Sequence, residues 1–420
     1  MRTMKDSGIE WVGRVPQSWS VNPIRAEFQE VTEKNKLGLV KNALKFTYGN
    51  IVKKDNFDAD DDNYVADTIL NYTVVNPGTI MLNGLNLNFD FVSQRVALVK
   101  ERGIITSAYI AFAPNSNGRI SSQFITYLLK AYDGCKAFHN MGGGVRKILN
   151  FSELKKQYIV YPTLVEQQRI ADFLDAKCAE IDALTADIQA QIDTLEQYKR
   201  SVITETVTKG LNPNAEMKDS GIEWVEQMPM SWNTVPNKYL MYKIKSICPI
   251  YNGENILSLT TNGVIIRDLN GGGKMPTSFD GYQKIVPGNL LMCLFDIDVT
   301  PRCIGLIKDY GLTSPAYSQF AMKDGAYAPY YYYYYLMVDY TKELLHMAKN
   351  LRHSLTEDQL GAIKAPNPPY EEQVQIAEFL DKKCVEISRV IEDKNKQLAT
   401  LDEYKKSLIF EYVTGKKEIV

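Results

Sequence analysis

The sequence of 420 residues is long enough for two to four domains, and its 45% hydrophobic and 23% charged residues are ordinary values for a globular protein. These proportions exclude an intrinsically disordered or collagen-like chain. The formal net charge of −2 gives no overall basic character, so any binding to nucleic acid must depend on local charge.

Targeting signals and disulfide patterns are absent from the sequence. No apolar run reaches the ~18–20 residues needed to cross a membrane, and the first residues carry charges where a signal peptide has its apolar core. The six cysteines include no C-x-x-C pair, which argues against a zinc ribbon or a disulfide framework. We therefore predict a cytoplasmic protein without a membrane partner.

The chain contains an internal duplication. Residues 4–12 and 217–225 share the nine letters MKDSGIEWV, and both copies are followed by Pro and then Ser-Trp. Near the end of each half, EQQRIADFLDAKCAEI at 166–181 matches EQVQIAEFLDKKCVEI at 372–387. A spacing of about 210 residues is far above the 20–50 of solenoid repeats, so we predict a duplicated domain pair.

The regions between the matched segments, residues 1–162 and 211–370, have diverged in sequence. In the first region, alternating or apolar runs predict strands at 68–75, 79–85, 95–99 and 108–113, and helical spacing predicts a helix over 122–135. In the second region, strands are predicted at 255–259, 289–295 and 303–307, and the tyrosine run 330–335 takes the place of the helix. Both regions therefore read as α+β domains with a strand-rich body and one or two helices.

The matched segments, residues 163–210 and 371–420, are predicted to be long helices. The first contains no Pro or Gly between 166 and 208, and Gly210 follows as a stop signal. In both segments apolar residues alternate at spacings of four and three, which indicates the seam of a coiled coil. The predicted seam residues are Leu174, Cys178, Ile181, Ile188, Ile192, Leu195 and Val202, and Leu380, Cys384, Ile387, Ile391, Leu398, Leu401 and Leu408.

These segments together predict the fold class. A helix of about 43 residues is roughly 65 Å long, and two matching seams in one chain most simply bury against each other. We predict an α+β chain with two globular domains separated by an antiparallel coiled coil of two long helices, related by an internal pseudo-two-fold repeat. The alternative is that the helices belong to the core of a larger bundle, which would show a broader apolar face.

Charge is distributed unevenly among the four segments. Residues 1–162 hold 20 basic and 15 acidic residues, whereas residues 163–210 hold 5 basic and 9 acidic residues. Residues 211–370 hold 14 basic and 15 acidic residues. Since DNA affinity relies on neutralising phosphates, the second domain would need a local basic patch or a partner protein.

One motif leaves an enzymatic alternative open. The sequence NPPY at Asn367-Pro368-Pro369-Tyr370 is the motif with which amino-methyltransferases hold a target amine. Such an enzyme also needs a glycine-rich cofactor turn after a strand, and none stands in a suitable place. We therefore interpret NPPY as a stiff lead into the second long helix, because proline disfavours helix in the residue before it.

Other motif-like segments predict neither a catalytic nor a metal site. The glycine triplets at 142–144 and 271–273 lack the spacing of a phosphate-binding loop. The acidic run at 58–62 lacks the glycine and terminal glutamate of a calcium loop. The three histidines lie apart from any nucleophile pattern, so no catalytic residues and no cofactor site are predicted in this chain.

Together, the duplicated motifs resemble those of the specificity subunits of type I restriction–modification systems. They are the D-S-G-I-E-W-V…P…W starts at 6–19 and 219–232 and the P-x-x-x-E-Q-x-x-I-A-x-F-L-D segments at 162–175 and 368–381. The approaches Arg146…Leu154 and Arg352…Leu360 also fit. The resemblance covers the whole chain.

The resemblance implies a non-catalytic DNA-specificity subunit. In that family each variable domain is a target-recognition domain that reads one half of a gapped, asymmetric site in double-stranded DNA, and the conserved helices form the spacer. Modification (methyltransferase) subunits, two by expectation, dock on the helices, and restriction/translocase subunits complete an endonuclease and adenine-N6 methyltransferase. S-adenosylmethionine, ATP and Mg²⁺ belong to those partners. A third interpretation, a coiled-coil adaptor that does not touch DNA, also remains open.

Candidate DNA-reading residues are polar, basic or aromatic side chains in expected loops, since sequence is read on base edges and register is set by phosphate contacts. In the first domain they are Lys53, Lys54, Asn83, Asn86, Asn88, Arg95, Tyr109, Arg146 and Lys147. In the second they are Asn262, Arg267, Lys274, Arg302, Tyr317, Lys349 and Arg352. Arg146 and Arg352 rank first because they hold matching places before the long helices.

Overall fold

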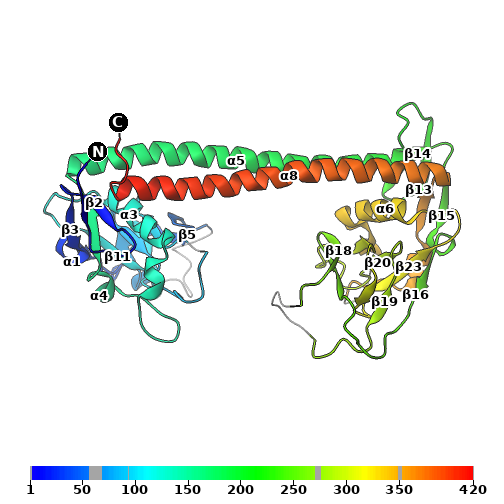
Figure 1. The fold of residues 1–420 in the computed structure, drawn as a ribbon, viewed down its shortest axis with the longest axis horizontal. Helices are drawn as coiled ribbons and strands as arrows, with labels where there is room; N and C mark the ends of the chain where they lie inside the picture. Colours follow the sequence, from blue (N-terminus) through cyan, green and yellow to red (C-terminus); the bar gives the residue numbers. More distant parts are fainter. Residues whose placement is uncertain (1, 56–68, 93, 270–275, 349–351, 420) are drawn as a thin grey trace. The chain divides into compact units, whose positions relative to one another are not determined.

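A computed structural model describes residues 2–55, 69–92, 94–269, 276–348 and 352–419 (Figure 1). It divides into two compact units. Unit 1 comprises Met1–Ile188 and Lys396–Val420, and unit 2 comprises Gln189–Asn395. The two long helices, α5 (Leu164–Lys209) and α8 (Tyr370–Val413), each contribute residues to both units. No helix in the described part of the chain is both long and apolar enough to cross a membrane.

Unit 1 is built on an antiparallel sheet with the strand order β4-β11-β8-β9. Its strands are β4 (Phe28–Glu30), β8 (Ile80–Leu82), β9 (Val96–Leu98) and β11 (Ile110–Pro114). Two-stranded sheets pair β1 (Met4–Asp6) with β2 (Arg14–Pro16), β3 (Ser20–Pro23) with β12 (Tyr158–Tyr161), β5 (Leu44–Thr47) with β6 (Asn50–Lys53), and β7 (Thr73–Val75) with β10 (Gly103–Ile105). The short helices are α1 (Ile24–Glu27), α3 (Ser122–Gly134), η1 (Ala137–Asn140) and α4 (Phe151–Leu154).

Unit 2 repeats this plan with the strand order β16-β23-β20-β21. Its strands are β16 (Met241–Ile244), β20 (Leu290–Met292), β21 (Ile304–Leu306) and β23 (Ser318–Met322). The two-stranded sheets pair β13 (Met217–Ile222) with β14 (Val225–Pro229), β15 (Asn233–Pro236) with β24 (Lys364–Asn367), β17 (Leu257–Thr260) with β18 (Gly263–Ile266), and β19 (Gln283–Ile285) with β22 (Gly311–Thr313). The short helices are η2 (Asn237–Tyr239), α6 (Ala328–Thr341), η3 (Glu343–Met347) and α7 (Glu357–Ala362).

The duplication therefore extends through the regions whose sequences have diverged. Each sheet of unit 1 has a counterpart in unit 2 made from strands in the same chain order. The α3 and α6 helices likewise hold equivalent places, each following the last strand of its four-stranded sheet. Both units are mixed α/β structures joined to long helices, as the sequence predicts.

The tyrosine run forms the buried helix α6. A helix that is apolar on every side is normally buried. Tyr330, Tyr331 and Tyr334 are each 0% exposed. Buried phenol groups need hydrogen-bond partners, and the described contacts supply them. The partners are the carbonyl of Val207 for Tyr330, Asn367 for Tyr331, Asp381 for Tyr333, Trp224 for Tyr334 and Asn237 for Tyr335.

Some predicted strands are shorter than their apolar runs. The run 68–75 forms a strand only at β7, because the amide of Tyr72 donates to the carbonyl of Ile69 and turns the chain before the strand begins. Residue 68 lies outside the described residues. The predicted runs 79–85 and 289–295 likewise give three-residue strands, β8 and β20, and their second halves enter loops.

The two long helices begin at Leu164 and Tyr370, within one residue of the predicted starts. The predicted seam residues are buried or half-buried: Leu174 and Leu380 are 0% exposed, and Ile181 and Ile387 are 7% and 6% exposed. In unit 1, Leu174 and Ile181 share a hydrophobic core with Leu408 of α8. In unit 2, Leu380 shares a core with residues from the end of α5.

Within each unit the two helices run antiparallel (Figure 1). In unit 1, the rings of Phe173 and Tyr412 lie 4.6 Å apart, and Lys405 pairs with Asp182 at 2.5 Å, so residue numbers rise along α5 as they fall along α8. In unit 2, the same order holds: Lys394 contacts Gln191, and Lys199 donates to Ser388 at 2.8 Å.

The duplicated N-terminal motif closes the end of a long helix in each unit. Gly210 follows α5 with φ +75°, and a Cβ there would lie 3.2 Å from the Trp232 ring. Gly415 follows α8 with φ +71°, and a Cβ there would lie 3.1 Å from the Trp19 ring. The tryptophan of the duplicated motif therefore packs against the glycine that follows the helix, and only glycine allows so close an approach.

Candidate nucleic-acid interface

Apart from Tyr109 and Tyr317, the predicted reading residues that the structure describes lie in three places that recur in both units. These are a β-hairpin, the loop that joins β8 to β9 in unit 1 and β20 to β21 in unit 2, and the segment that follows the 3₁₀ helix η1 or η3. We call the second place the sheet loop (residues 83–95 in unit 1 and 293–303 in unit 2). We call the third the brace segment (141–149 in unit 1 and 352–355 in unit 2).

The hairpins β5–β6 and β17–β18 carry Lys53, Lys54, Asn262 and Arg267. The amide of Lys54 donates to the carbonyl of Ala43 at 2.9 Å, and the amide of Arg267 donates to that of Ile256 at 2.7 Å, so the two basic residues are structural equivalents. Asn262 is exposed in its hairpin turn. Lys53 is exposed, and its Nζ lies 3.7 Å from the Oε2 atom of Glu101.

The base of the sheet loop is the same in both units. The amide of Asn83 donates to the carbonyl of Arg95 at 2.8 Å, and the amide of Cys293 donates to that of Cys303 at the same distance. A helix carboxylate closes each loop: Asp133 accepts from the Arg95 amide and Asp339 from the Cys303 amide, both at 2.8 Å. Burial raises the pKa of Asp133 above its ordinary value, against the hydrogen bond from the Arg95 amide.

Arg95 does not fit its predicted role as a reader. Its side chain is 0% exposed, and its guanidinium donates to the loop carbonyls of Asn83 at 3.0 Å, Leu85 at 2.8 Å and Asp90 at 2.7 Å. A buried guanidinium cannot reach a base edge. Because these carbonyls would otherwise be unsatisfied inside the protein, Arg95 holds the shape of the sheet loop from beneath.

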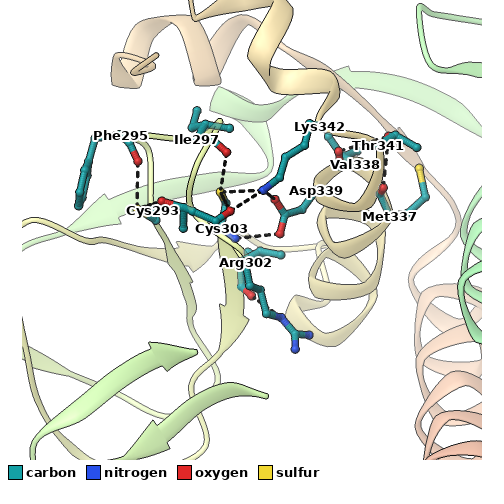
Figure 2. A network of polar contacts seen from close by, with 12 residues as sticks. Cys293, Phe295, Ile297, Arg302, Cys303, Met337, Val338, Asp339, Thr341 and Lys342 are labelled. Atoms are coloured by element: carbon teal, nitrogen blue, oxygen red, sulfur yellow. Dashed lines mark hydrogen bonds and ion pairs between the residues drawn. The ribbon is translucent and has the colours of Figure 1, made fainter. Parts of the chain in front are cut away.

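In unit 2 a lysine bonds to the sheet loop (Figure 2). Lys342, at the end of α6, donates to the carbonyl of Thr300 at 2.7 Å and to Asp339 at 2.8 Å, and its Nζ lies 3.6 Å from the Cys303 sulfur. Burial raises the pKa of the Cys303 thiol to about 12, so the thiol stays protonated. A cation again satisfies a carbonyl of the sheet loop, although it comes from another element.

The sheet loop and the brace segment are bonded together in each unit. In unit 1, the Leu149 amide donates to the Gly84 carbonyl at 2.9 Å, and the Asn88 side chain donates to the Val145 carbonyl at 3.0 Å. Gly84 is required there, because a Cβ would lie 2.4 Å from the Leu149 oxygen. Val145 itself is 91% exposed.

Unit 2 repeats the bonding of its sheet loop to its brace segment. The Leu355 amide donates to the Leu294 carbonyl at 2.8 Å. The Asp296 amide donates to the Arg352 carbonyl at 2.9 Å. In both units the two stretches therefore form one surface.

The remaining predicted readers divide by exposure. Asn86, Arg146 and Arg352 are exposed on this surface, and Asn83, Asn88 and Lys147 are half-buried within it. Tyr109 and Tyr317 are half-buried equivalents that pack on Phe46 and Phe295, with ring centroids 5.3 and 6.2 Å apart. Lys274 and Lys349 lie outside the described residues, as do the glycine triplet 271–273 and the acidic run 58–62.

The Arg302 side chain makes hydrogen bonds within unit 2. It donates to the Tyr332 hydroxyl at 2.6 Å and to the Thr261 carbonyl in the hairpin turn. The hairpin is thereby joined to the foot of the sheet loop. In unit 1 the corresponding contact is between Gly49 and Gln94, since a Cβ on Gly49 would lie 2.7 Å from the Gln94 side chain.

The NPPY segment has a structural place. Asn367 ends β24, its side-chain oxygen accepts from Tyr331 at 2.9 Å and from Gln373 at 3.2 Å, and α8 begins at Tyr370. This agrees with the interpretation as a lead into the helix. Among the residues that the structure describes, no three His, Cys, Asp or Glu side chains cluster so as to hold a metal ion.

Sequence reasoning missed the residues that join each domain to its long helix. Gln167 and Gln373 are 0% exposed. Gln167 accepts from the Ser121 amide at 2.8 Å, and Gln373 accepts from the Tyr327 amide at 2.8 Å. Both glutamines stand in the duplicated E-Q pair, and that identity at the start of two helices was a usable signal.

Comparison with known proteins finds relatives of one class. Residues 94–194 match the family model described as "Type I restriction modification DNA specificity domain". The chain is 25% identical over 430 residues to the "Type I restriction enzyme MjaVIII specificity subunit" of Methanocaldococcus jannaschii, covering 96% of this chain and 94% of the relative. It is 23% identical over 436 residues to the "Putative type I restriction enzyme MjaX specificity subunit" of the same organism, covering 96% and 95%.

One solved structure has the same fold. A structure described as "Structural basis underlying complex assembly and conformational transition of the type I R-M system" matches 96% of this chain and 99% of its own, with a TM-score of 0.71 at 13% identity. The HsdS subunit from Thermoanaerobacter tengcongensis covers 96% and 98%, with a TM-score of 0.46 and 13% identity. The chain is thus similar over 96% of its length to type I restriction–modification specificity subunits, and residues 94–194 match their DNA specificity domain, in agreement with the duplicated motifs.

Proposed function

We propose that this chain is the non-catalytic subunit that selects the DNA target of a type I restriction–modification complex. Each unit reads one half of a gapped, asymmetric site in double-stranded DNA. The observation that carries this proposal is that one complete unit, with its hairpin, sheet loop and brace segment, occurs twice in a single chain with different side chains. Two readers of different sequence give an asymmetric site with two halves.

The long helices fix the interval between the half-sites in this proposal. Fixed geometry between two DNA-binding elements sets the spacing of their half-sites, as dimer symmetry does for operators. The continuous helices α5 and α8 are the only described elements that belong to both units, which makes them the parts able to set this interval. The proposed architecture is therefore two target-recognition domains with an antiparallel coiled-coil spacer.

Exposed apolar residues recur on the long helices and support docking of two modification subunits. Leu184 and Val390 occupy equivalent positions and are 47% and 45% exposed, and Tyr198 and Tyr404 are 53% and 54% exposed. Exposed apolar and aromatic groups of this kind mark protein interfaces. Because each unit holds one residue of each pair, two copies of one partner can dock in equivalent ways.

The catalytic cofactors belong to the partners in this proposal. S-adenosylmethionine would bind the modification subunits, and ATP and Mg²⁺ would serve the restriction/translocase subunits. The assembled complex would act on DNA in the cytoplasm.

The test is a domain exchange. Residues 1–162 are replaced by the corresponding segment of a specificity subunit that has a different target, and the complex with modification subunits is expressed. Methylation-aware sequencing should then show one changed half-site and an unchanged second half-site at the same spacing. The reciprocal exchange of residues 211–370 is the matched control and should change the other half. A change in both halves, or in neither, contradicts the assignment of one reader to each unit.

A further inference from the structure

Unusual backbone conformations occur at equivalent positions of the two units. Asn86 has φ +53° and Asp296 has φ +47°, and each is the fourth residue after its sheet strand. Lys147 has φ +36° and His353 has φ +41°, 206 positions apart, which is the offset of the long-helix match. Non-glycine residues adopt this left-handed conformation uncommonly, with Asn, Asp and His the most tolerant, and glycine adopts it freely.

A third pair of residues with positive φ makes hydrogen bonds to the sheet loops. Lys136 and Lys342 have φ +58° and +55° at the ends of α3 and α6. Lys136 donates to the carbonyl of Phe91, and Lys342 donates to that of Thr300 at 2.7 Å, so both side chains fasten the sheet loop. This pair has a positioning role and kept the same residue type in both units.

The first two pairs differ from the lysine pair in chemistry. The φ values at these positions are similar in the two units, but the side chains differ. The amide of Asn86 is replaced by the carboxylate of Asp296, and the amine of Lys147 is replaced by the imidazole of His353. Asn86 is exposed, and the His353 side chain is 46% exposed beside Asp298 at 3.9 Å. Retention of a side chain where glycine fits the backbone better, together with a change of side chain between two readers, points to a contact with the ligand.

We propose that these positions determine the base preference of each half-site. Asn86 and Lys147 contact base edges in the half-site of unit 1. Asp296 and His353 make the corresponding contacts in the half-site of unit 2. The inference rests on the proposed function and names its reading residues.

The chemistry of each side chain predicts the kind of contact. An asparagine amide both donates and accepts, which suits the N6 and N7 groups of adenine. An aspartate carboxylate only accepts, which suits the N4 amino group of cytosine. The two units thereby obtain different preferences from similar backbone arrangements that Arg95 and Lys342 hold by hydrogen bonds to the sheet loops.

The test uses glycine substitutions, because glycine keeps the left-handed backbone and removes only the side chain. Asn86→Gly, Lys147→Gly, Asp296→Gly and His353→Gly are each made in the full chain and purified with modification subunits. Targets are then selected from a randomised duplex DNA library. Each variant should lose about ten-fold discrimination at one or two base pairs of its own half-site. The other half-site in the same molecule is the internal control and should be unchanged.

The outcomes separate this inference from the proposed function. If the unmodified complex selects no gapped motif, the proposed function fails and the inference with it. If the unmodified complex selects a gapped motif and all four glycine variants select the same motif, the inference alone is wrong. The exchanges Asn86→Asp and Asp296→Asn keep residues that tolerate this backbone, so they test the same point should a glycine variant fold poorly. They should alter the preferred base in the affected half-site, and an unaltered preference would also contradict the inference.

Discussion

Buried polar side chains join the domains to their helices, and each can be tested singly. The Gln167 amide accepts from the Ser121 amide at 2.8 Å and donates to the carbonyls of Arg119 and Pro162, both at 2.9 Å. Three backbone groups from two loops therefore depend on one side chain. Gln373 makes the equivalent set of bonds in unit 2 with the Tyr327 amide and the carbonyls of Gly325 and Pro368.

Gln167→Ala should lower the free energy of unfolding of unit 1 by about 1–3 kcal/mol, because it leaves buried backbone groups without partners. The matched control is Gln168→Ala on the exposed side of the same helix turn, which should change stability by less than about 0.5 kcal/mol. Urea unfolding followed by hydrogen exchange, which reports each unit separately, measures both variants. Equal losses for the two variants would show that the buried amide has no special role.

A second residue-scale prediction concerns acid stability. Glu27 is 1% exposed, and although burial raises the pKa of its carboxyl, hydrogen bonds from Tyr161, Asn117 and Asn22 outweigh burial and hold that pKa below its ordinary value of 4.5. A lowered folded-state pKa gives stability that is present above about pH 4.5 and is lost as the pH falls through the folded-state pKa. Glu27→Gln should therefore flatten the acid side of the stability profile of unit 1. Glu10→Gln, at an exposed position, should leave the profile unchanged, and an identical profile for all three proteins would refute the prediction.

Single residues are also where sequence reasoning reached its limit. Arg95 stands in an alternating run next to a loop, and the pattern alone does not tell an exposed reader from a buried support. The decision depends on Asp133 and on the loop carbonyls, which are brought to Arg95 by the fold. By contrast, the repeat offset singled out Arg146 and Arg352, and both are exposed, while their role in reading DNA stays a prediction.

At the scale of elements, the long helices were the most predictable part. Both helices begin within a residue or two of the predicted starts, and the predicted seam residues are buried or half-buried. Short strands were less predictable, because runs such as 68–75 contain a turn whose hydrogen bond the apolar pattern does not reveal. The prediction of a long helix draws on a period that repeats over many residues. The prediction of a three-residue strand depends on the position of a single turn.

A charge in the seam should separate buried from exposed helix positions. Ile181 is 7% exposed in the core that includes Leu408, so Ile181→Asp buries an unpaired carboxylate and should destabilise unit 1 by about 3–5 kcal/mol. Ala183→Asp, two residues along on the exposed side, should cost less than about 1 kcal/mol. Hydrogen exchange across α5 measures the difference. Similar protection in the two variants would mean that the seam is not a buried interface.

The helix ends offer a graded test of the glycine contacts. A Cβ on Gly415 would lie 2.4 Å from the Pro16 ring, which is rigid, whereas a Cβ on Gly210 would meet the Glu372 carboxylate at 2.9 Å, which can move. Gly415→Ala should therefore destabilise its unit by about 2–4 kcal/mol and Gly210→Ala by less. Gly118→Ala, with φ +69° and no atom within 4 Å, gives the backbone cost alone, about 1 kcal/mol. Thermal unfolding of the three variants should follow this order, and the same shift in all three would contradict it.

At the scale of the whole molecule, unit 1 is built from both ends of the chain. The end of α8 supplies Leu408, Ile409 and Val413 to its core. Arg2 pairs with Glu166 and with Glu418, both at 2.5 Å. Unit 2, in contrast, is one continuous stretch of chain. The sequence predicts the repeat. It does not show that the C-terminal end of α8 packs in unit 1, because the matched segments occur in the same order in both halves of the chain.

This arrangement predicts an asymmetric response to truncation. A chain ending at Asn395 lacks the C-terminal part of unit 1 and keeps every residue of unit 2. Unit 1 should then lose its fold, because three core side chains are removed and the apolar faces of α3 and α5 are exposed to water. Limited proteolysis with mass spectrometry should show rapid cleavage within residues 1–188 and a resistant fragment from unit 2. A chain ending at Gly415 keeps Val413 and the buried Thr414 and should resist cleavage in both units. Equal resistance of the two truncated chains would mean that unit 1 folds without the end of α8.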